Sequence, residues 1–288
     1  MLTLQGINKS FDRILVLHQL NWEIGDNRII GLVGSNGSGK STLLRCISGV
    51  YTPDSGSILY DGESVEKHRQ DMFFVSDEPF YVNRFTTKEM KNFYRSFYQR
   101  FDDEKYNHLI QSFDFDDTKP IPQLSKGLKR QSALILALSC RPKLLLLDES
   151  FDGLDPRMRL QLKREMIANV EEGDFSVIIS SHNIRELEDI CDGMSLLENR
   201  QIVFTRTLEQ LNTEYHKMQI GYDQAPPIEA LAHMSFLSME ALNRVVTVTY
   251  RGKDVEAQIA QTHPVLMNPL PISMEEIFVV EMEAKHEK

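Results

Sequence analysis

The sequence predicts an α/β fold, in which helices cover a mostly parallel β-sheet and a small α+β extension follows. Two observations support this prediction. Strand-like apolar runs alternate with helix-like stretches along most of the chain, which is the pattern of parallel strands joined by crossover helices. A glycine-rich loop, GSNGSGKST, joins one such strand to one such helix at residues 34–42. Of the 288 residues, 41% are hydrophobic, which is enough apolar material for a sizeable core.

The first third of the chain contains the strand and the helix that flank this loop. Residues 14–34 have a strand-like composition and end in the apolar run 29–33, and a helix is expected at residues 40–48. Turn pairs bracket a short strand between residues 53 and 62. From Thr86 to Phe113, large apolar residues recur every three or four positions, which predicts an amphipathic helix that packs against a core.

The middle of the chain continues the alternation. We expect helices at residues 129–139 and 156–170, buried strands at residues 144–147 and 176–180, and one more helix after them. Asp155 is followed by proline, which is typical of a helix start. The aspartate caps the helix, and the fixed φ of proline suits the first helical position.

The pattern changes after about residue 213, so we predict a main domain at 1–213 and an extension at 214–288. Its expected elements are a linker at Pro226-Pro227, a strand at 244–250, a short helix at 254–261 and a capped helix at 273–278. A segment of this size is small for an independent hydrophobic core. We therefore expect it to pack on the main domain or on a partner.

Composition excludes several classes of protein. The net charge of −10 argues against nucleic-acid binding, which needs a basic surface. Three scattered cysteines without metal-ligand spacing suit a reducing cytosol. The N-terminus has no apolar signal segment, and the longest uncharged apolar stretch, Gln131 to Cys140, is about half of the ~20 residues that a spanning helix needs. We expect a cytoplasmic protein that reaches a membrane only through a partner.

The glycine-rich loop fits the phosphate-binding pattern G-x-x-x-x-G-K-[ST]. Its glycines allow backbone N–H groups to point at phosphate oxygens, and the following helix adds its positive N-terminal end. Lys40 would reach the β- and γ-phosphates of ATP, and Ser41 would coordinate Mg²⁺. The predicted ATP-binding residues of the loop are Gly34, Ser35, Asn36, Gly37, Ser38, Gly39, Lys40, Ser41 and Thr42.

A second motif, LLLLDES, follows the predicted strand at residues 144–147. The strand delivers Asp148 and Glu149 to its carboxyl end, where open α/β sheets bind their ligands. Asp148 suits a Mg²⁺ ligand, and Glu149 suits a general base that activates water. An Asp-Glu pair after apolar residues is common, so the motif gains its meaning from the phosphate-binding loop.

Together these motifs resemble the nucleotide-binding subunits of ATP-binding cassette (ABC) transporters, over residues 2–212. Four further segments match the family in the right order. LSKGLKRQ is similar to the LSGGQ signature, SFDGLD to the D-loop, and a histidine follows the strand at residues 176–180. An aromatic residue also stands where the family stacks one on adenine. The residues identified by these matches are Phe11, Leu124, Ser125, Lys126, Gly127, Leu128, Gly153, Leu154, Asp155 and His182.

The resemblance implies an architecture and a mechanism. A P-loop ATPase of this type has an N-terminal β subdomain, a RecA-like core and a helical signature subdomain, here at about residues 80–135. Two subunits would enclose two ATP molecules, each P-loop facing Ser125 and Gly127 of the other chain. His182 would hold the γ-phosphate and the attacking water, while Glu149 polarises that water. Hydrolysis would then depend on dimerisation.

The sequence departs from the family pattern at two places. In the signature, Lys126 replaces a glycine and Leu128 a glutamine. Asp77 stands where the family has a glutamine that contacts Mg²⁺ and couples to the membrane partner. Aspartate is shorter and lacks the amide donor, so we predict slower turnover or an altered metal geometry. Alternatively, Glu78 takes this role through a one-residue shift.

The resemblance also implies a permease partner in the membrane. Phe80, Tyr81 and Phe85 fall where the family docks a coupling helix of that partner, although core packing explains them equally well. The sequence is closest in character to exporters of peptides, antibiotics or drugs. The alternatives are a soluble ABC-type ATPase and a regulatory module in which ATP controls dimerisation.

Overall fold

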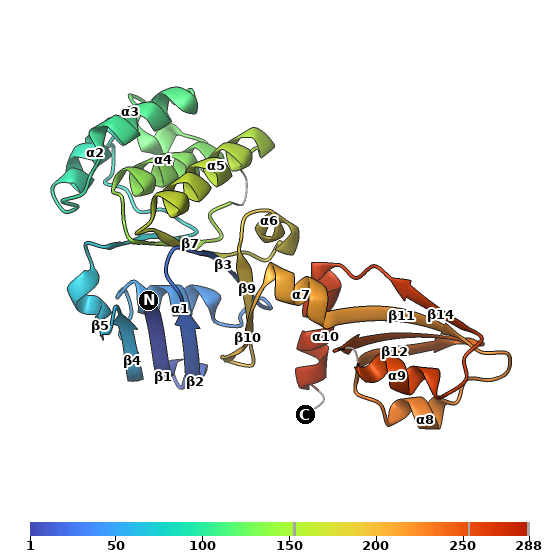
Figure 1. The fold of residues 1–288 in the computed structure, drawn as a ribbon. Coiled ribbons are helices and arrows are strands. Elements are labelled where there is room, and N and C mark those ends of the chain that lie inside the picture. Colours follow the sequence, from blue (N-terminus) through green and yellow to red (C-terminus); the bar gives the residue numbers. More distant parts are fainter. Residues whose placement is uncertain (152–153, 253, 287–288) are drawn as a thin grey trace. The chain divides into compact units, whose positions relative to one another are not determined.

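The computed structural model describes residues 1–151, 154–252 and 254–286 (Figure 1). The chain divides into two compact units, Met1–Thr205 and Arg206–Lys288, and each is described by itself. This division precedes the predicted boundary at residue 213. The difference arises because helix α7 (Leu208–Glu214) packs against the first strand of the second unit.

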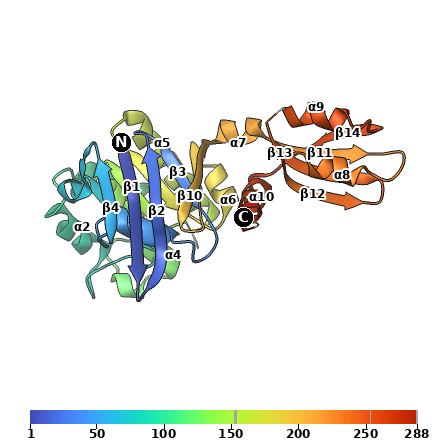
Figure 2. The ribbon, with the colours of Figure 1, turned by 90° about the horizontal axis from the view of Figure 1, so that it is seen from below.

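The first unit begins with an antiparallel sheet in the strand order β2-β1-β4-β5. Its strands are β1 (Leu2–Phe11), β2 (Ile14–Ile24), β4 (Ser55–Tyr60) and β5 (Glu63–Ser64). The three long strands lie side by side in Figure 2. Buried residues of β1 and β2 are separated by more exposed ones, as expected for a sheet with one face on a core.

A second sheet of six strands forms the centre of the first unit, in the order β10-β9-β3-β8-β7-β6. Its strands are β3 (Ile29–Val33), β6 (Met72–Val75), β7 (Leu144–Asp148), β8 (Ser176–Ser180), β9 (Gly193–Glu198) and β10 (Gln201–Thr207). Four of its strand pairs are parallel: β6–β7, β7–β8, β8–β3 and β3–β9. Every residue of β3, β7 and β8 is buried, which is typical of a parallel sheet covered on both faces. The predicted parallel α/β fold is therefore confirmed.

Helix α1 (Lys40–Ile47) packs against one face of this parallel sheet. Leu43 and Leu44 of α1 belong to one buried cluster with Leu144 and Leu146 of β7. The same cluster includes Trp22 and other residues of the antiparallel sheet. In Figure 1, α4 and α5 lie on the opposite side of β7 from α1. The two sheets and α1 thus share one core, which fixes the loop before α1 against the sheet.

A cluster of helices, α2 (Thr87–Arg95), α3 (Asp103–Ser112) and α4 (Lys126–Ser139), forms the layer predicted at about residues 80–135. The expected amphipathic stretch from Thr86 to Phe113 is two helices, not one. The break follows from capping: Asp102 accepts a hydrogen bond from the N–H of Lys105 and starts α3. Met90 is fully buried, so part of the apolar stripe is core, as predicted.

Two helices alternate with the last parallel strands. Helix α5 (Pro156–Glu172) begins as predicted, with the Asp155 carboxylate accepting from the N–H of Met158 at 3.0 Å. Helix α6 (Ile184–Glu188) follows β8. No helix among the described residues is long and apolar enough to span a bilayer.

The second unit is an antiparallel sheet in the order β12-β13-β11-β14 with helices between its strands. Its elements after α7 are β11 (Tyr215–Gly221), α8 (Ile228–Ala232), β12 (Phe236–Leu242), β13 (Val245–Arg251), α9 (Asp254–Ala260), β14 (Leu266–Leu270) and α10 (Met274–His286). This β-α-β-β-α-β order is that of a ferredoxin-like fold. Pro226-Pro227, predicted as a linker, lies inside the unit between β11 and α8.

The second unit has a hydrophobic core of its own, which the sequence-based expectation did not foresee. Met218 and Ile220 of β11 meet Val246 and Val248 of β13 in this core. Residues of α8 and α9, Leu231 and Ile259 among them, cover it. Two short helices on one face of four strands thus give a small segment enough buried surface for a core.

Candidate nucleotide-binding site

The glycine-rich loop runs from the end of β3 to the start of α1, as predicted. A Cβ atom on Gly34 would lie 2.1 Å from the carbonyl oxygen of Leu197 in β9, so only glycine fits there. Gly39, the N-cap of α1, has φ of 108°, which also favours glycine. The loop is therefore pressed against the neighbouring strand and turned so that α1 begins at Lys40.

The Lys40 side chain folds back on the loop and is buried. Its ammonium donates hydrogen bonds to the carbonyl oxygens of Gly34, at 2.8 Å, and Ser35, at 3.0 Å. Burial lowers the pKa of Lys40, while the negative charges of Glu149, Asp148 and Glu198 oppose this shift. A positive charge with three carboxylates nearby is thus held against two carbonyl oxygens of the loop.

Asp148 lies at the end of β7 beside the first turn of α1. Its Oδ1 accepts a hydrogen bond from Ser41 Oγ at 3.0 Å and another from Ser180 Oγ at 2.7 Å. Its Oδ2 is buried and has no hydrogen-bond partner among the described residues. A buried carboxylate oxygen without a partner is costly unless a cation binds it. Ser41 and Asp148 therefore fit a Mg²⁺ ion, which is usually held by one or two protein oxygens together with phosphate oxygens.

Glu149 follows directly and has an uncommon backbone conformation. Its φ is 48°, a region that non-glycine residues visit mainly at functional sites or turns. Its N–H donates to the carbonyl oxygen of Ser180 at 3.1 Å, which fixes this geometry to β8. His182 Nδ1 lies 3.9 Å from Glu149 Oε1. The structure thus brings together the predicted base and the predicted histidine.

Comparison with known proteins agrees with this geometry. The family model described as "ABC transporter" matches residues 17–152. The ABC transporter ATP-binding protein YtrB of Bacillus subtilis is 32% identical, and the alignment covers 99% of both chains. The chain belongs to this family. The resemblance seen in the motifs is confirmed, and the chain is an ATP-binding subunit of an ABC transporter, from a family that hydrolyses ATP to power transport.

Other relatives in the ABC family differ in the direction of transport. The xylose/arabinose import ATP-binding protein XylG of Sulfolobus acidocaldarius is 28% identical over 74% of this chain and 91% of its own. The lipopolysaccharide export system ATP-binding protein LptB of Haemophilus influenzae is 28% identical over 73% of this chain and 92% of its own. A solved ATP-binding subunit of an ABC transporter shares the fold, with a TM-score of 0.67 and 23% identity over 74% of this chain and 92% of that one.

The remaining residues of the ABC P-loop have varied surroundings. Asn36 and Gly37 lie exposed at its tip, Ser38 is buried with its N–H bonded to the Ser35 carbonyl, and Thr42 is half-buried in α1. Phe11 ends β1 with an exposed ring, 5.2 Å from the ring of Tyr51 in an edge-on contact. Lys9 Nζ lies 5.3 Å from the centroid of the same ring. The partial exposure of the ring agrees with adenine stacking, which stays a prediction.

The signature residues form the start of α4. Ser125 is the N-cap, and its Oγ accepts from the N–H of Leu128 at 3.3 Å. Leu124 is buried, while Lys126 and Leu128 are exposed and Gly127 is half-buried. The first N–H groups of a helix have no partner within the helix, which suits a phosphate. Their contact with ATP on a second chain stays a prediction.

The D-loop lies between β7 and α5. Gly153 falls outside the described residues. Leu154 is buried, and its carbonyl oxygen accepts hydrogen bonds from Arg159. Asp155 caps α5, which gives it a structural role whether or not it also meets a partner chain.

Asp77 lies in the loop after β6 and is 49% exposed. Its Oδ1 is 3.4 Å from the Arg45 guanidinium, one turn beyond Ser41 on α1. An exposed ion pair of this length stabilises the loop weakly. Its predicted role toward Mg²⁺ stays a prediction, as does the alternative role of Glu78.

Two polar residues of this site were missed by the sequence analysis: Ser180 and Glu198. Ser180 is the last residue of β8 and Glu198 is the last residue of β9. Both strands are parallel neighbours of β3, so these residues lie at the same edge of the sheet as the P-loop. The carboxyl end of a parallel strand is where ligand-binding side chains gather, so that position was the available signal.

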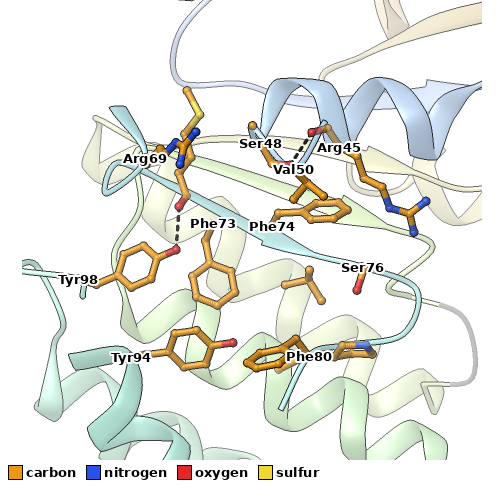
Figure 3. A pocket seen from close by; sticks show the side chains of 15 residues that line it. Arg45, Ser48, Val50, Arg69, Phe73, Phe74, Ser76, Phe80, Tyr94 and Tyr98 are labelled. Atoms are coloured by element: carbon orange, nitrogen blue, oxygen red, sulfur yellow. Dashed lines mark hydrogen bonds between the residues drawn. The ribbon is translucent and has the colours of Figure 1, made fainter. Parts of the chain in front are cut away.

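A separate pocket of about 560 Å³ lies between α1, β6 and α2 (Figure 3). Figure 3 shows aromatic rings of Phe73, Phe80, Tyr94 and Tyr98 along it. Tyr98 donates to the Met72 carbonyl at 3.0 Å, and burial raises the pKa of Tyr94 to about 12. The tyrosines are therefore neutral, and the pocket is an aromatic groove with arginines at its rim.

Proposed function

We propose that two copies of this chain, or this chain and a related one, close around two Mg²⁺·ATP and hydrolyse them to drive export through a separate membrane subunit. The observation that carries this proposal is the Ser41–Asp148 hydrogen bond, with Lys40 beside it. Three side chains from two distant motifs meet where a triphosphate would lie along the P-loop.

Ser41 and Asp148 would hold the Mg²⁺ ion, with Asp77 as a further candidate. The ion would supply positive charge to the phosphate oxygens. Lys40 and the loop amides would bind and orient the phosphates. Pre-oriented donors of this kind do not have to reorganise when charge moves during the reaction.

Glu149 would take a proton from the attacking water, and His182 would hold that water and the γ-phosphate. The short distance between the two side chains supports a shared water. The signature residues Ser125 and Gly127 of the second chain would complete the γ-phosphate site. One chain alone then has half of each site, so turnover should rise with protein concentration.

The test is the Glu149→Gln variant of the full chain. Glutamine keeps the shape but cannot act as a base, so ATP turnover should fall at least ~100-fold, the usual contribution of a general base. ATP should then accumulate in a dimer, measurable by light scattering after size exclusion. Normal hydrolysis by this variant would show that Glu149 is not the base.

We further propose that the aromatic groove docks a helical segment of the membrane subunit. Phe80 is 68% exposed there although it is a large apolar residue, and apolar surface of this kind marks contact sites. Tyr81 lies instead in a neighbouring cavity beside Lys129, and Phe85 is half-buried. Phe80→Glu should release the membrane subunit without lowering ATP binding; co-purification of the two measures it.

The signature-like loop favours export of a peptide, antibiotic or drug from the cytoplasmic face. Transport into reconstituted vesicles tests this direction. When ATP is supplied outside the vesicles, an exporter should accumulate its substrate inside them. The alternative is a soluble ATPase or a regulatory module, which would co-purify with no multi-span protein.

A further inference from the structure

Glu198 is a buried carboxylate at the carboxyl end of β9, only 5% exposed. Strands β9 and β3 are parallel neighbours, with Leu196 opposite Val33. Ser35 lies two residues after Val33, and Glu198 lies two residues after Leu196, so the two side chains are close to each other. Ser35 N–H donates to Glu198 Oε2 at 3.2 Å, and Ser35 Oγ donates to Oε1 at 3.0 Å. Both oxygens of one carboxylate thus hold the second residue of the P-loop.

The same peptide group is held from its other side by Lys40. Gly34 and Ser35 share one peptide bond, whose carbonyl oxygen and N–H point in opposite directions because the peptide is planar and trans. The carbonyl accepts from Lys40 Nζ at 2.8 Å, while the N–H donates to Glu198. A cation and an anion therefore clamp one peptide, and hydrogen bonds to charged groups in such a chain strengthen each other.

The close approach of β9 reinforces this clamp. The carbonyl of Leu197, next to Glu198, leaves no room for a Cβ at Gly34. The Gly34–Ser35 peptide can therefore shift little toward β9. Its tilt then depends on Glu198, which accepts a hydrogen bond from its N–H. A buried negative charge beside a phosphate site also repels the ligand. A carboxylate at this position therefore needs another contribution that favours ATP binding.

We propose that Glu198 is a positioning residue: it fixes the tilt of the Gly34–Ser35 peptide and thereby holds the Lys40 ammonium where the β- and γ-phosphates bind. The proposal rests on ATP binding by the P-loop. It assigns to Glu198 no contact with ATP itself. Its effect should be larger for ATP than for ADP, because a misplaced lysine loses the γ-phosphate contact that only ATP offers.

The test compares Glu198→Ala and Glu198→Gln with a control directly before the same strand, Asp192→Ala. Asp192 accepts from the N–H of Ile29 at 2.8 Å, so it makes the same kind of bond at the opposite end of β9 and β3. Isothermal titration calorimetry with Mg²⁺·ATP and with ADP gives the affinities, and thermal unfolding gives the stability of each variant.

We expect Glu198→Ala to weaken ATP binding about tenfold, the order expected for one charge-assisted hydrogen bond, and ADP binding less. Glu198→Gln, which still accepts from Ser35 N–H, should recover most of the ATP affinity. Asp192→Ala should lower the unfolding temperature and leave both affinities unchanged. Tighter ATP binding by Glu198→Ala, equal losses for ATP and ADP, or the same loss in Asp192→Ala would overturn the proposal.

A double-mutant cycle keeps the proposal testable if Glu198→Ala does not fold. Ser35→Ala and Glu198→Gln both remove the hydrogen bond from Ser35 Oγ to Glu198 Oε1. The small loss of ATP affinity that Glu198→Gln causes should therefore disappear when Ser35 is already alanine, so the two changes should be non-additive. Additive losses would overturn the positioning role. If the wild-type protein fails to bind Mg²⁺·ATP, the proposed function is overturned. If the wild type binds normally and the Glu198 variants bind ATP with unchanged affinity, only this inference is overturned.

Discussion

The two units of the chain differ in where their polar side chains gather. In the first unit, β3, β7, β8 and β9 are parallel, and the residues at their carboxyl ends meet at one edge: the P-loop, Asp148, Ser180 and Glu198. In the second unit, neighbouring strands run in opposite directions, so their carboxyl ends alternate between two edges. The family match, residues 17–152, lies wholly in the first unit.

This difference explains why chemistry is concentrated in one unit. Parallel strands collect several chain segments at a single edge, where a ligand can contact all of them. The antiparallel sheet places its chemistry on its faces: one is occupied by the core, and Lys217 and Tyr215 on the other pair with Glu276 and Glu281 of α10. The comparison therefore predicts that nucleotide binding and the fold of the second unit respond to different substitutions.

The largest effect is expected for Lys40→Ala. It removes the buried charge that would meet the phosphates, so Mg²⁺·ATP affinity should fall at least ~100-fold, as for a desolvated charge pair. The matched control is Lys217→Ala in the second unit, whose lysine pairs with Glu276. Calorimetric titration measures both. Equal Mg²⁺·ATP affinity of Lys40→Ala and the wild type would show that Lys40 does not bind the phosphates.

A smaller effect is expected for Ile220→Ala, in the core of the second unit. Removing a fully buried isoleucine side chain should destabilise that unit by ~2–5 kcal/mol. Trp22 is the single tryptophan of the chain and lies in the first unit, so its fluorescence reports that unit alone. We expect an early unfolding step in circular dichroism without a change in Trp22 fluorescence or ATP affinity. Loss of ATP binding would show that the units are coupled.

The pH dependence of ATP affinity should also reflect the burial of Lys40 in the first unit. Because burial lowers the pKa of Lys40 below its ordinary value of 10.5, Lys40 loses its proton earlier than an exposed lysine does. Between the lowered pKa and 10.5, ATP affinity should fall as pH rises. Stability of the ligand-free protein should rise in the same window, because the unfolded chain then binds more protons. Lys40→Arg stays charged and should show no such fall; an identical pH profile for both would contradict the assignment.

The smallest effect concerns thiol reactivity. All three cysteines lie in the first unit and are buried, and burial raises the pKa of Cys46 to about 11. A disulfide reagent at neutral pH should therefore label none of them rapidly, since the thiolate is the reactive form. Ile220→Ala should not change the labelling rate. Faster labelling in that variant would show that the second unit stabilises the first.

Much of the site was predictable because its chemistry is local. The P-loop needs glycines, a lysine and a serine at fixed spacing, and an apolar strand and a helix frame them. The capped start of α5 is equally local. The two motifs alone predicted that Ser41 and Asp148 share a Mg²⁺ ion, and the two side chains are joined by a hydrogen bond.

The parts that escaped prediction depend on contacts between distant residues. Ser35 and Glu198 are 163 positions apart, and no local pattern marks their bond. The order of strands in the second unit likewise depends on pairing across the sheet. The split between α2 and α3 was missed because the aromatic spacing continues through the break, which a single capping residue, Asp102, creates.

The proposed mechanism depends on Ser41 and Asp148 holding Mg²⁺ together with ATP on the P-loop. The most direct test titrates the full chain with ATP, with Mg²⁺ and with EDTA, in the wild type and in the isosteric variant Asp148→Asn. We expect Mg²⁺ to strengthen ATP binding to the wild type and to have little effect on ATP binding to Asp148→Asn. Equal enhancement by Mg²⁺ in both proteins, or no ATP binding by the wild type, would contradict it.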